Sequence, residues 1–353
     1  MKKRRFLIRW ANRVVFLTTL LVGLGSLVSS NWLPGASLLS LIFPLLILPN
    51  VVLLLLSLRY MARKSPITMI GIGLTIIPVL AQLPFATAPE EQLDDIKIAT
   101  YNVRGFYQEA SVSEQIAKWT SEQNIDILCM QEIRKSAASP IAERFPFRTH
   151  APKWSGYSVG IYSTYAIINS GSLEFDRVEK QSYARFSAGF ADIILPFDTV
   201  RVLNVHLSST GVQDGDMTVE PTREDLLEAS QFVAKKIAAS DLNRGLQAEH
   251  IVEWVEDSPH PVILCGDFNG VPGGNLYARL LTNLIDPYIF KGHGPMGTFE
   301  PLQRRHLPIR IDWTLHSKEL IATGQYVDHI YLSDHFPLVT TISGLYQVEP
   351  PLE

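Results

Sequence analysis

Long apolar runs occupy the first quarter of the chain, and shorter alternating runs occupy the rest. Three runs near the N-terminus contain no charged residue, at 14–30, 38–58 and 67–86. Each is close to the length of about 20 residues that a helix needs to cross the hydrocarbon core of a bilayer. Membrane helices tolerate the prolines in the second and third runs when other groups satisfy the freed carbonyls. The pattern therefore predicts three transmembrane helices rather than buried helices of a soluble domain.

The basic residues predict the orientation of these helices. Lys and Arg cluster before the first run and between the second and the third, whereas the loop 31–36 between the first two carries none. Because positively charged loops stay in the cytoplasm, we expect the N-terminus there, and three crossings place everything after Ala86 on the other side. A cleavable signal peptide is the alternative for the first run. No clear cleavage site follows it, and two further spans would retain the protein in the membrane.

The periodicity changes after these runs. Residues 87–93 have the composition of a short linker, residues 94–346 are predicted to form one domain, and residues 347–353 form a tail. Within the domain, apolar strand-like runs alternate with helical patterns at 113–123, 221–239 and 244–256. Such an alternation predicts an α/β fold with a sheet core.

Composition separates the two regions further. The chain has 353 residues, of which 46% are hydrophobic, and a net charge of −4. Nine of the 31 Lys and Arg residues lie in 1–64, and no acidic residue precedes Glu90. Residues 65–353 therefore carry a net charge of −13. An acidic domain is not expected to coat nucleic acid by neutralising phosphates, although a local metal site can still cleave it. Cys129 and Cys265 both lie in apolar runs, which favours buried free thiols over a disulfide.

Several strand-like runs end in an acid, an amide or an imidazole. The clearest is PVILCGDFNG at 261–270, which ends in Asp267 and Asn269, two positions on one face of a strand. Other runs end at Asn102, Glu132, His206, Asp312, Asp334 and His335. If neighbouring strands present these ends along one sheet edge, their oxygen atoms suit Mg²⁺ or Mn²⁺. The histidines supply proton transfer and phosphate contact, and a zinc site made of cysteines is not expected.

The motifs at these endings resemble those of a known family. TYNVRG, MQEIR, NVHLSS, CGDFNGVP, RIDW and SDHFPL match, in order, motifs of the endonuclease/exonuclease/phosphatase superfamily, which includes DNase I, the abasic-site endonucleases, the neutral sphingomyelinases and the inositol polyphosphate 5-phosphatases. The resemblance covers 96–344 and none of the apolar runs. It implies a four-layered α/β sandwich of two mixed sheets between helices. It also implies a hydrolase that uses Mg²⁺ or Mn²⁺ and an activated water, without a covalent intermediate.

The resemblance implies a metal and water site. Glu132 would be the principal metal ligand, with Asn102 beside it and Asp334 near the metal. Asp267 would orient or deprotonate the attacking water, and Asn269 would hold a phosphate oxygen. A divalent ion in this place would draw charge from the phosphoryl oxygens.

The resemblance also implies phosphate-contacting histidines. His335, held by Asp312, would contact the phosphate and stabilise its developing charge or transfer a proton. His206 would lie on the phosphate or leaving-group side. Weaker candidates for substrate contact, each also compatible with a structural role, are Phe299, Tyr157, Tyr162 and Arg244.

The sequence leaves the substrate open. A domain held outside the cytoplasm, which is the periplasm in a Gram-negative bacterium, favours a phospholipid head group or another small phosphodiester. Nucleic acid is the second expectation, because DNase-like relatives are also acidic and rely on the metal, and a soluble polyol phosphate is the third. A catalytically silent binding module is the alternative from another class, and the presence of Glu132, Asp267 and His335 speaks against it. The expected partners are the lipid bilayer and the phosphate ester, and no protein partner can be inferred.

Overall fold

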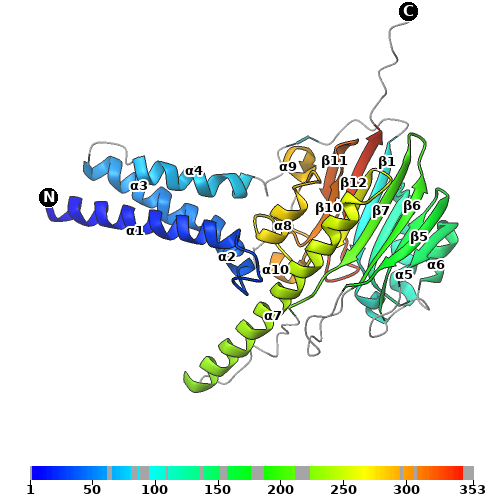
Figure 1. The fold of residues 1–353 in the computed structure, drawn as a ribbon, viewed down its shortest axis with the longest axis horizontal. Coiled ribbons are helices and arrows are strands. Elements are labelled where there is room, and N and C mark those ends of the chain that lie inside the picture. Colours follow the sequence, from blue (N-terminus) through cyan, green and yellow to red (C-terminus); the bar gives the residue numbers. More distant parts are fainter. Residues whose placement is uncertain are drawn as a thin grey trace, which may run out of the picture. The chain divides into compact units, whose positions relative to one another are not determined.

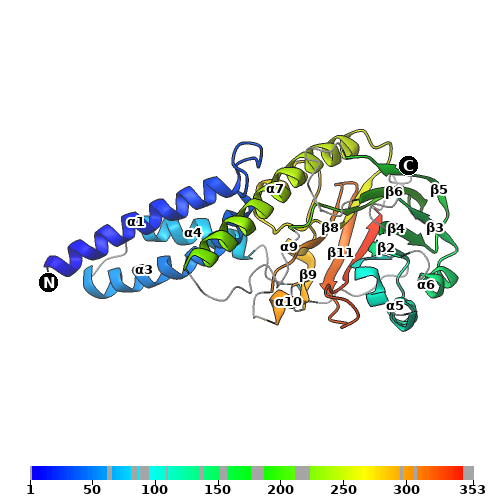
Figure 2. The same cartoon turned by 90° about the horizontal axis from the view of Figure 1, so that it is seen from below.

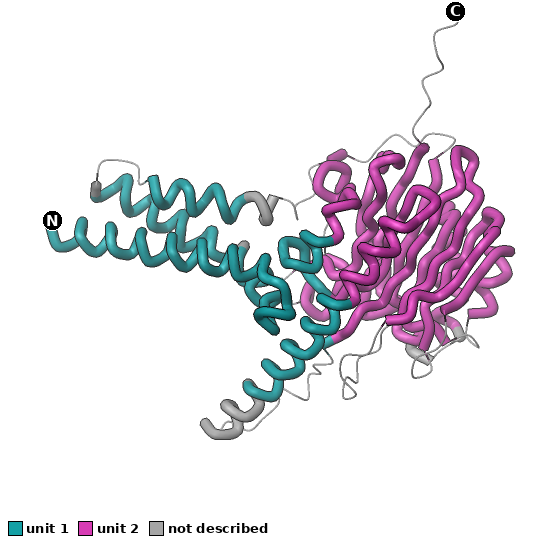
Figure 3. The backbone as a smooth tube through the Cα atoms, viewed as in Figure 1, with its two compact units in different colours: residues 1–83, 210–246, 270–279 teal, residues 84–209, 247–269, 280–353 magenta. Residues whose placement is uncertain are grey.

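The computed structural model of the chain describes residues 2–61, 66–80, 86–87, 95–108, 110–134, 138–151, 157–175, 187–210, 223–294, 297–304 and 308–344. The chain divides into two compact units, which Figure 3 shows in two colours. The helical unit comprises residues 1–83, 210–246 and 270–279, and the sheet unit comprises residues 84–209, 247–269 and 280–353. Most of the predicted linker and all of the predicted tail lie outside the described residues.

Two mixed β-sheets form the centre of the sheet unit (Figure 1). The strands are β1 (Ile96–Asn102), β2 (Ile127–Ile133), β3 (Phe147–His150), β4 (Ser158–Ser163), β5 (Ile167–Leu173), β6 (Ser187–Ile194), β7 (Thr199–His206), β8 (Val262–Asp267), β9 (Gly292–His293), β10 (Asp312–His316), β11 (Leu320–Val327) and β12 (Leu338–Gly344). The larger sheet has the order β3-β4-β2-β1-β12-β11-β9, and the smaller sheet has the order β10-β8-β7-β6-β5. β1 pairs with β2 and β7 with β8 in parallel, so the site strands end at common edges.

The alternation along β1 builds two layers of core. Ile96 and Ile98 lie in the apolar core that residues of both sheets share, together with the free and buried Cys129 and Cys265. Ala99 and Tyr101 face the opposite way and pack with helix residues. Because side chains alternate between the faces of a strand, one strand serves both cores. Each buried aliphatic side chain contributes roughly 1.5–3 kcal/mol to folding.

Helices cover the outer faces of the sheets. α5 (Ala110–Glu122) and α6 (Ser139–Arg144) pack on the larger sheet, where the ring centroids of Trp119 and Tyr101 are 6.1 Å apart. The last part of α7 (Arg223–Glu256) packs on the smaller sheet, where Trp254 meets Phe190 at 5.4 Å. Two mixed sheets flanked by helices confirm the predicted core architecture. Short helices complete the unit: η2 (Arg104–Gln108), α9 (Tyr288–Lys291) and α10 (Glu300–Gln303), with α8 (Asn275–Leu280) crossing the boundary between the units.

The helices predicted separately at 221–239 and 244–256 form one helix, α7, over the described residues (Figure 2). Residues 240–243, which separate the two predicted segments, include neither Gly nor Pro. The Ser240 hydroxyl donates back to the carbonyl of Ile237 at 3.0 Å, a bond that an intact helix accommodates. The side chain of Asp241 finds partners outside the helix. Residues 240–243 therefore mark a contact that α7 makes and not the end of a helix.

The helical unit corrects the prediction of three membrane-spanning helices. Its first residues form α1 (Lys2–Ser26), α2 (Ser37–Ile42), η1 (Phe43–Leu46), α3 (Ile47–Met61) and α4 (Pro66–Leu80). Among the described residues, α1 alone is long and apolar enough to cross a membrane. The second run changes to a 3₁₀ turn at Phe43–Leu46, where Pro44 has no amide hydrogen to continue the α-helical pattern. The third run is helical over 15 residues, and 81–85 lie outside the described part.

Polar side chains lie inside this bundle, and large apolar side chains lie outside it. Asn12 Nδ2 donates to Ser57 Oγ, and Asn50 Nδ2 donates to Thr19 Oγ1, both at 2.9 Å between buried groups. Buried polar residues recur at seven-residue spacing in α1 (Asn12, Thr19, Ser26), α3 (Asn50, Ser57) and α4 (Thr68, Thr75). Exposed side chains include Phe6, Trp10, Leu17, Leu21, Leu24, Leu48, Val52 and Leu55. This polarity is the reverse of a water-soluble bundle and is typical of helices that associate in lipid.

Gly266, the residue before Asp267, requires the absence of a side chain. Its φ is +144°, and an added Cβ would overlap the carbonyl oxygen of Val205 on the neighbouring strand. We expect Gly266→Ala to lower the free energy of unfolding by about 3 kcal/mol, since backbone strain and overlap act together. Gly294→Ala is the matched control, because φ is +74° there and no atom lies within 4 Å of an added Cβ. We expect it to cost about 1 kcal/mol in urea denaturation, and equal losses in both variants would contradict the steric argument.

Candidate functional site

Asp267, at the end of β8, lies at the centre of the predicted strand-end residues. Asn102 Nδ2 donates to Asp267 Oδ2 at 3.0 Å, and the amide of Asn269 donates to Oδ1 at 2.9 Å. The Nε2 atoms of His206 and His335 lie 3.6 and 3.8 Å from the same Oδ2. Asp267 itself is 1% exposed. A carboxylate with donors on both oxygens is held in one orientation.

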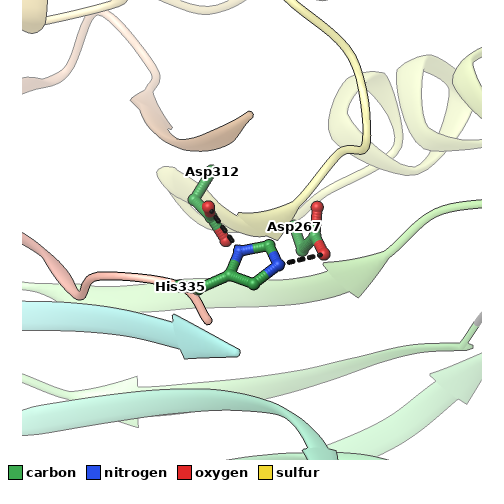
Figure 4. A group of neighbouring side chains, drawn as sticks. All are labelled: Asp267, Asp312 and His335. Carbon is green, nitrogen blue, oxygen red and sulfur yellow. Dashed lines mark hydrogen bonds and ion pairs between the residues drawn. The ribbon is translucent and has the colours of Figure 1, made fainter. Parts of the chain in front are cut away.

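His335 lies between two carboxylates (Figure 4). Its Nδ1 donates to Asp312 Oδ2 at 2.9 Å, which leaves Nε2 directed at Asp267. Asp312 is opposite Asp267 in the β8–β10 ladder, and the Thr298 hydroxyl oxygen accepts its amide hydrogen at 3.1 Å. A carboxylate on one ring nitrogen fixes both the tautomer and the orientation of an imidazole. The ladder therefore builds an oriented Asp312–His335 pair beside Asp267.

The buried pair has shifted protonation equilibria. Burial lowers the pKa of His335, but the carboxylates of Asp312, Asp267 and Asp334 outweigh burial and raise this pKa to about 10. Burial raises the pKa of Asp312, the charge of His335 opposes that shift, and Asp267 adds to it. Nearby opposite charge and loss of hydration thus act against each other in both groups. With a pKa of about 10, His335 is a cation at neutral pH.

Glu132 reaches the site from a strained position in β2. Its φ is +54°, where the register of the β2–β4 ladder shifts between Met130 and Ile133. Positive φ is uncommon for residues other than glycine, and such strain is concentrated at functional sites. Oε1 of Glu132 lies 3.9 Å from His206 Nε2. Asn269 also has a positive φ, of +49°, and its Nδ2 donates to the carbonyl of Leu207 at 3.1 Å.

Asn102 connects Asp267 to Arg104. Oδ1 of Asn102 accepts the backbone amide of Arg104 at 3.0 Å, and the Arg104 guanidinium lies 3.0 Å from Asp334 Oδ2. Arg104, Gly105 and Phe106 have successive positive φ values of 42°, 66° and 59°. Sequence reasoning did not assign a role to Arg104. The available signal was a single basic residue within TYNVRG, next to a group of acidic strand ends.

The donor set fits a hard divalent cation. Ligand atoms of Asp267, Asp312 and His335 lie within 4.8 Å of one another. Asp312, however, is engaged with His335, and an imidazole is a poorer ligand for Mg²⁺ than a carboxylate or an amide oxygen. The carboxylates of Glu132 and Asp334 and the amide oxygen of Asn102, which the sequence predicts as metal ligands, are oxygen donors of the kind that hard divalent cations prefer. Asp312 is therefore assigned as the partner of His335 and not as a metal ligand.

The weaker substrate candidates lie in different places. The Phe299 ring lies 5.1 Å from the His335 ring, and the two backbones form a β-bridge. The hydroxyl of Tyr157 accepts a hydrogen bond from Arg134 at 2.9 Å. Tyr162 is 1% exposed in the core on the outer face of the larger sheet. Arg244 lies in the helical unit.

A buried amide pair joins the two sheets beneath the site. Gln131 Nε2 donates to Asn204 Oδ1 at 2.6 Å and to Thr100 Oγ1 at 3.0 Å. Asn204 Nδ2 donates to the carbonyls of Met130 and Gly160, each at 2.9 Å. Gln131 directly precedes Glu132, and Asn204 lies two residues before His206. Sequence reasoning did not identify this pair, because an amide within an apolar run does not reveal its partner in another sheet.

Glu132→Gln should weaken the metal site while preserving the fold. The amide has the shape of the carboxylate but no negative charge, so we expect the metal concentration at half-maximal activity to rise about tenfold or more. Activity against Mg²⁺ concentration gives this midpoint, and magnesium binding by calorimetry checks it without turnover. Glu114→Gln, on α5, is a control that should leave the midpoint unchanged. An unchanged midpoint in Glu132→Gln would contradict the metal assignment.

Comparisons with known proteins identify the family and the fold of this chain. Residues 99–335 match the model of the endonuclease/exonuclease/phosphatase family. The sequence has no match among curated proteins. Similar solved structures include a conserved protein of unknown function from Enterococcus faecalis V583, with 20% identity, a TM-score of 0.52, and coverage of 70% of this chain and 100% of that one.

Two further structures have the same fold. An endonuclease/exonuclease/phosphatase from Beutenbergia cavernae DSM 12333 has 15% identity, a TM-score of 0.53, and coverage of 71% of this chain and 72% of that one. A humanized D. rerio TDP2 has 16% identity, a TM-score of 0.52, and coverage of 71% and 99%. At these identities the likeness establishes the fold and leaves activity to be argued from the site.

Proposed function

This chain belongs to the endonuclease/exonuclease/phosphatase family, and from that premise we propose that it is a membrane-anchored, metal-dependent phosphodiesterase. The observation that carries the proposal is the convergence on Asp267 of two histidines and two amide donors. Such a group supports a site in which a base and phosphate-binding side chains act together beside a metal ion. The reaction that uses all of them is attack of water on a phosphate ester.

Each side chain has a role in that reaction. Asp267, held by Asn102 and Asn269, orients the water and accepts its proton as the new P–O bond forms. His335, a cation held by Asp312, stabilises the negative charge that develops on the phosphoryl oxygens. The leaving-group P–O bond breaks, and His206, 3.6 Å from Asp267, transfers a proton to the departing oxygen. The products are a phosphomonoester and an alcohol.

A metal ion completes the site in this proposal. Glu132, Asp334 and Asn102 would hold Mg²⁺ or Mn²⁺, which when bound supplies positive charge that polarises the phosphoryl oxygens. Contacts within the chain restrict the positions of the three side chains that would hold the metal. Glu132 is fixed by its strained backbone, Asn102 by Arg104 and Asp267, and Asp334 by the guanidinium of Arg104.

The reversed polarity of the helical unit supports the membrane part of the proposal. A lipid environment would cover the exposed Phe, Trp and Leu side chains of α1 and α3, and the buried Asn–Ser and Asn–Thr hydrogen bonds would hold the helices together. The basic N-terminus favours the cytoplasm. If α1 crosses the bilayer once, the residues that follow it lie outside the cytoplasm.

The acidic character of residues 65–353 favours a lipid or small phosphodiester over nucleic acid. We would test the full-length protein in detergent with bis(p-nitrophenyl) phosphate, supercoiled plasmid and phospholipid, each with Mg²⁺, Mn²⁺ or a chelator. The expected result is metal-dependent hydrolysis of a diester that Asp267→Asn lacks. Nicking of plasmid alone would make nucleic acid the substrate. A folded protein that cleaves no phosphate ester with any divalent metal would overturn the proposed function.

A further inference from the structure

The loop between α1 and α2 packs against two segments from the second half of the chain. We call residues 27–37 the anchor loop. In Figure 3 it belongs to the same compact unit as residues 210–246 and 270–279. The first of these segments begins four residues after His206, and the second begins directly after Asn269. The chain thus passes from both site strands into the unit that holds the anchor loop.

Asp241 of α7 makes the first contact with the anchor loop. Its Oδ2 accepts the amide hydrogens of Gly35 at 3.0 Å and Ser37 at 3.2 Å, at the beginning of α2. Its Oδ1 lies 3.6 Å from the guanidinium of Arg244, and both charged residues are buried, at 4% and 2% exposure. A buried carboxylate is costly unless it is paired and hydrogen-bonded. The burial of Asp241 is therefore explained by the loop that it binds.

Asn275 makes a second, independent contact. Its Nδ2 donates to the carbonyl of Leu27, just beyond the last residue of α1, at 2.9 Å. The neighbouring Gly274 is closely approached, since an added Cβ would lie 3.1 Å from Ser40 Oγ. On α7, an added Cβ at Gly245 would lie 3.4 Å from Ser30 Cβ. Two segments distant in sequence therefore hold opposite ends of the anchor loop.

The same two segments continue into contacts with residues beside the site. Gln247 lies six residues after Asp241, about 9 Å further along α7, and its Oε1 accepts the amide hydrogen of Ser208 at 3.0 Å. Ser208 follows His206 by two residues. Asn275 follows Asn269 by six residues, and Asn269 is bonded to both Asp267 and Leu207. The chain is thus held by hydrogen bonds shortly after it leaves β7, at Ser208, and shortly after it leaves β8, at Asn269.

We propose that Asp241 and Asn275 are positioning residues for the phosphoesterase reaction. By binding the anchor loop, they fix the chain where it leaves β7 and β8 and so keep His206 and Asp267 in their working geometry. The N-terminal region then acts as a structural part of the catalyst as well as an anchor. The predicted effect on turnover rests on the proposed function, whereas the predicted effect on chain mobility does not.

The test uses the full-length protein in phospholipid nanodiscs, with hydrogen exchange as the first measurement and hydrolysis of soluble bis(p-nitrophenyl) phosphate as the second. In Asp241→Ala and Asn275→Ala, we expect amides of 207–210 and 268–271 to exchange about tenfold faster. We expect kcat to fall about tenfold and KM to stay within about twofold, since misplacement affects the reacting groups most. Asp241→Asn, which retains an oxygen acceptor, should recover part of the loss.

Glu253→Ala is the matched control, because it lies on α7 with a side chain that is 69% exposed. It should behave as the wild type in both measurements. Unchanged exchange in Asp241→Ala and Asn275→Ala would overturn the proposal, and so would faster exchange with an unchanged kcat. If Asp241→Ala does not fold, Asn275→Ala and Asp241→Asn provide the comparison. A wild-type protein that hydrolyses no ester would refute the proposed function, while the exchange data would still decide whether the loop restrains the site.

Discussion

Replacing Asp267 with asparagine is expected to lower kcat by about 10³-fold, the range typical of removing a general base. Asparagine has nearly the same shape, so the fold should remain, but it cannot accept the proton of the attacking water. Its amide nitrogen would also oppose that of Asn102, which donates to Asp267 at 3.0 Å. Steady-state kinetics at saturating Mg²⁺, with thermal unfolding followed by circular dichroism, would measure both effects.

Asp192→Asn is the matched control for that experiment. Asp192 is 2% exposed in the sheet unit, but its carboxylate binds Arg201 and Asn169 rather than the histidines of the site. Its replacement should lower stability and leave kcat near the wild-type value. If Asp267→Asn kept more than half of the wild-type kcat, Asp267 would not be the base. If both variants lost activity equally, the loss would reflect folding rather than chemistry.

Arg310→Met is expected to lower the free energy of unfolding by about 3–5 kcal/mol, the range for removing one partner of a buried ion pair. Arg310 and Asp286 are both fully buried, and Nη2 lies 2.5 Å from Oδ2. The guanidinium also lies 4.4 Å from the centre of the Tyr288 ring. Without Arg310, the carboxylate of Asp286 loses its counter-charge inside the protein. Urea denaturation of the two proteins would give the difference.

The double variant Asp286→Leu/Arg310→Met separates charge from packing. Because no charge is left buried, we expect it to recover at least half of the stability lost in Arg310→Met. A loss below about 1 kcal/mol in the single variant would contradict the assignment of a buried charge pair. The kcat of the variants would show whether the loss of Arg310 also disturbs Asp312, which lies two residues later at the beginning of β10.

The sheet core and the residues around Asp267 could be predicted because they leave a regular trace in the sequence. Strands buried on both faces give continuous apolar runs, and a polar residue at the end of such a run is conspicuous. Asp267 and His206 are recognisable in this way, since each ends a parallel strand of the smaller sheet. The order of the motifs then predicted that strands far apart in the chain contribute to one site.

Other features depend on partners that the local sequence does not specify. Tyr162 and Tyr157 have similar surroundings in sequence, but one lies in the core and the other contacts Arg134. Asp241 lies between the two segments that were predicted as separate helices, and its partners are amides some 200 residues earlier in the chain. The run 38–58 is apolar enough for a membrane helix, yet Pro44 changes the backbone hydrogen bonding within it. Tertiary contacts and backbone chemistry decide these cases.

The pairing of β1 with β12 determines when during synthesis the protein can complete its fold. Ile96 is paired with Ile342, so this edge of β1 stays unpaired until β12 has left the ribosome. His335 emerges only three residues before β12, whereas Asn102 emerges more than 200 residues earlier. A nascent chain therefore presents Asn102, Glu132 and Asp267 before His335 has been synthesised. The complete candidate site therefore forms only after β12 has docked.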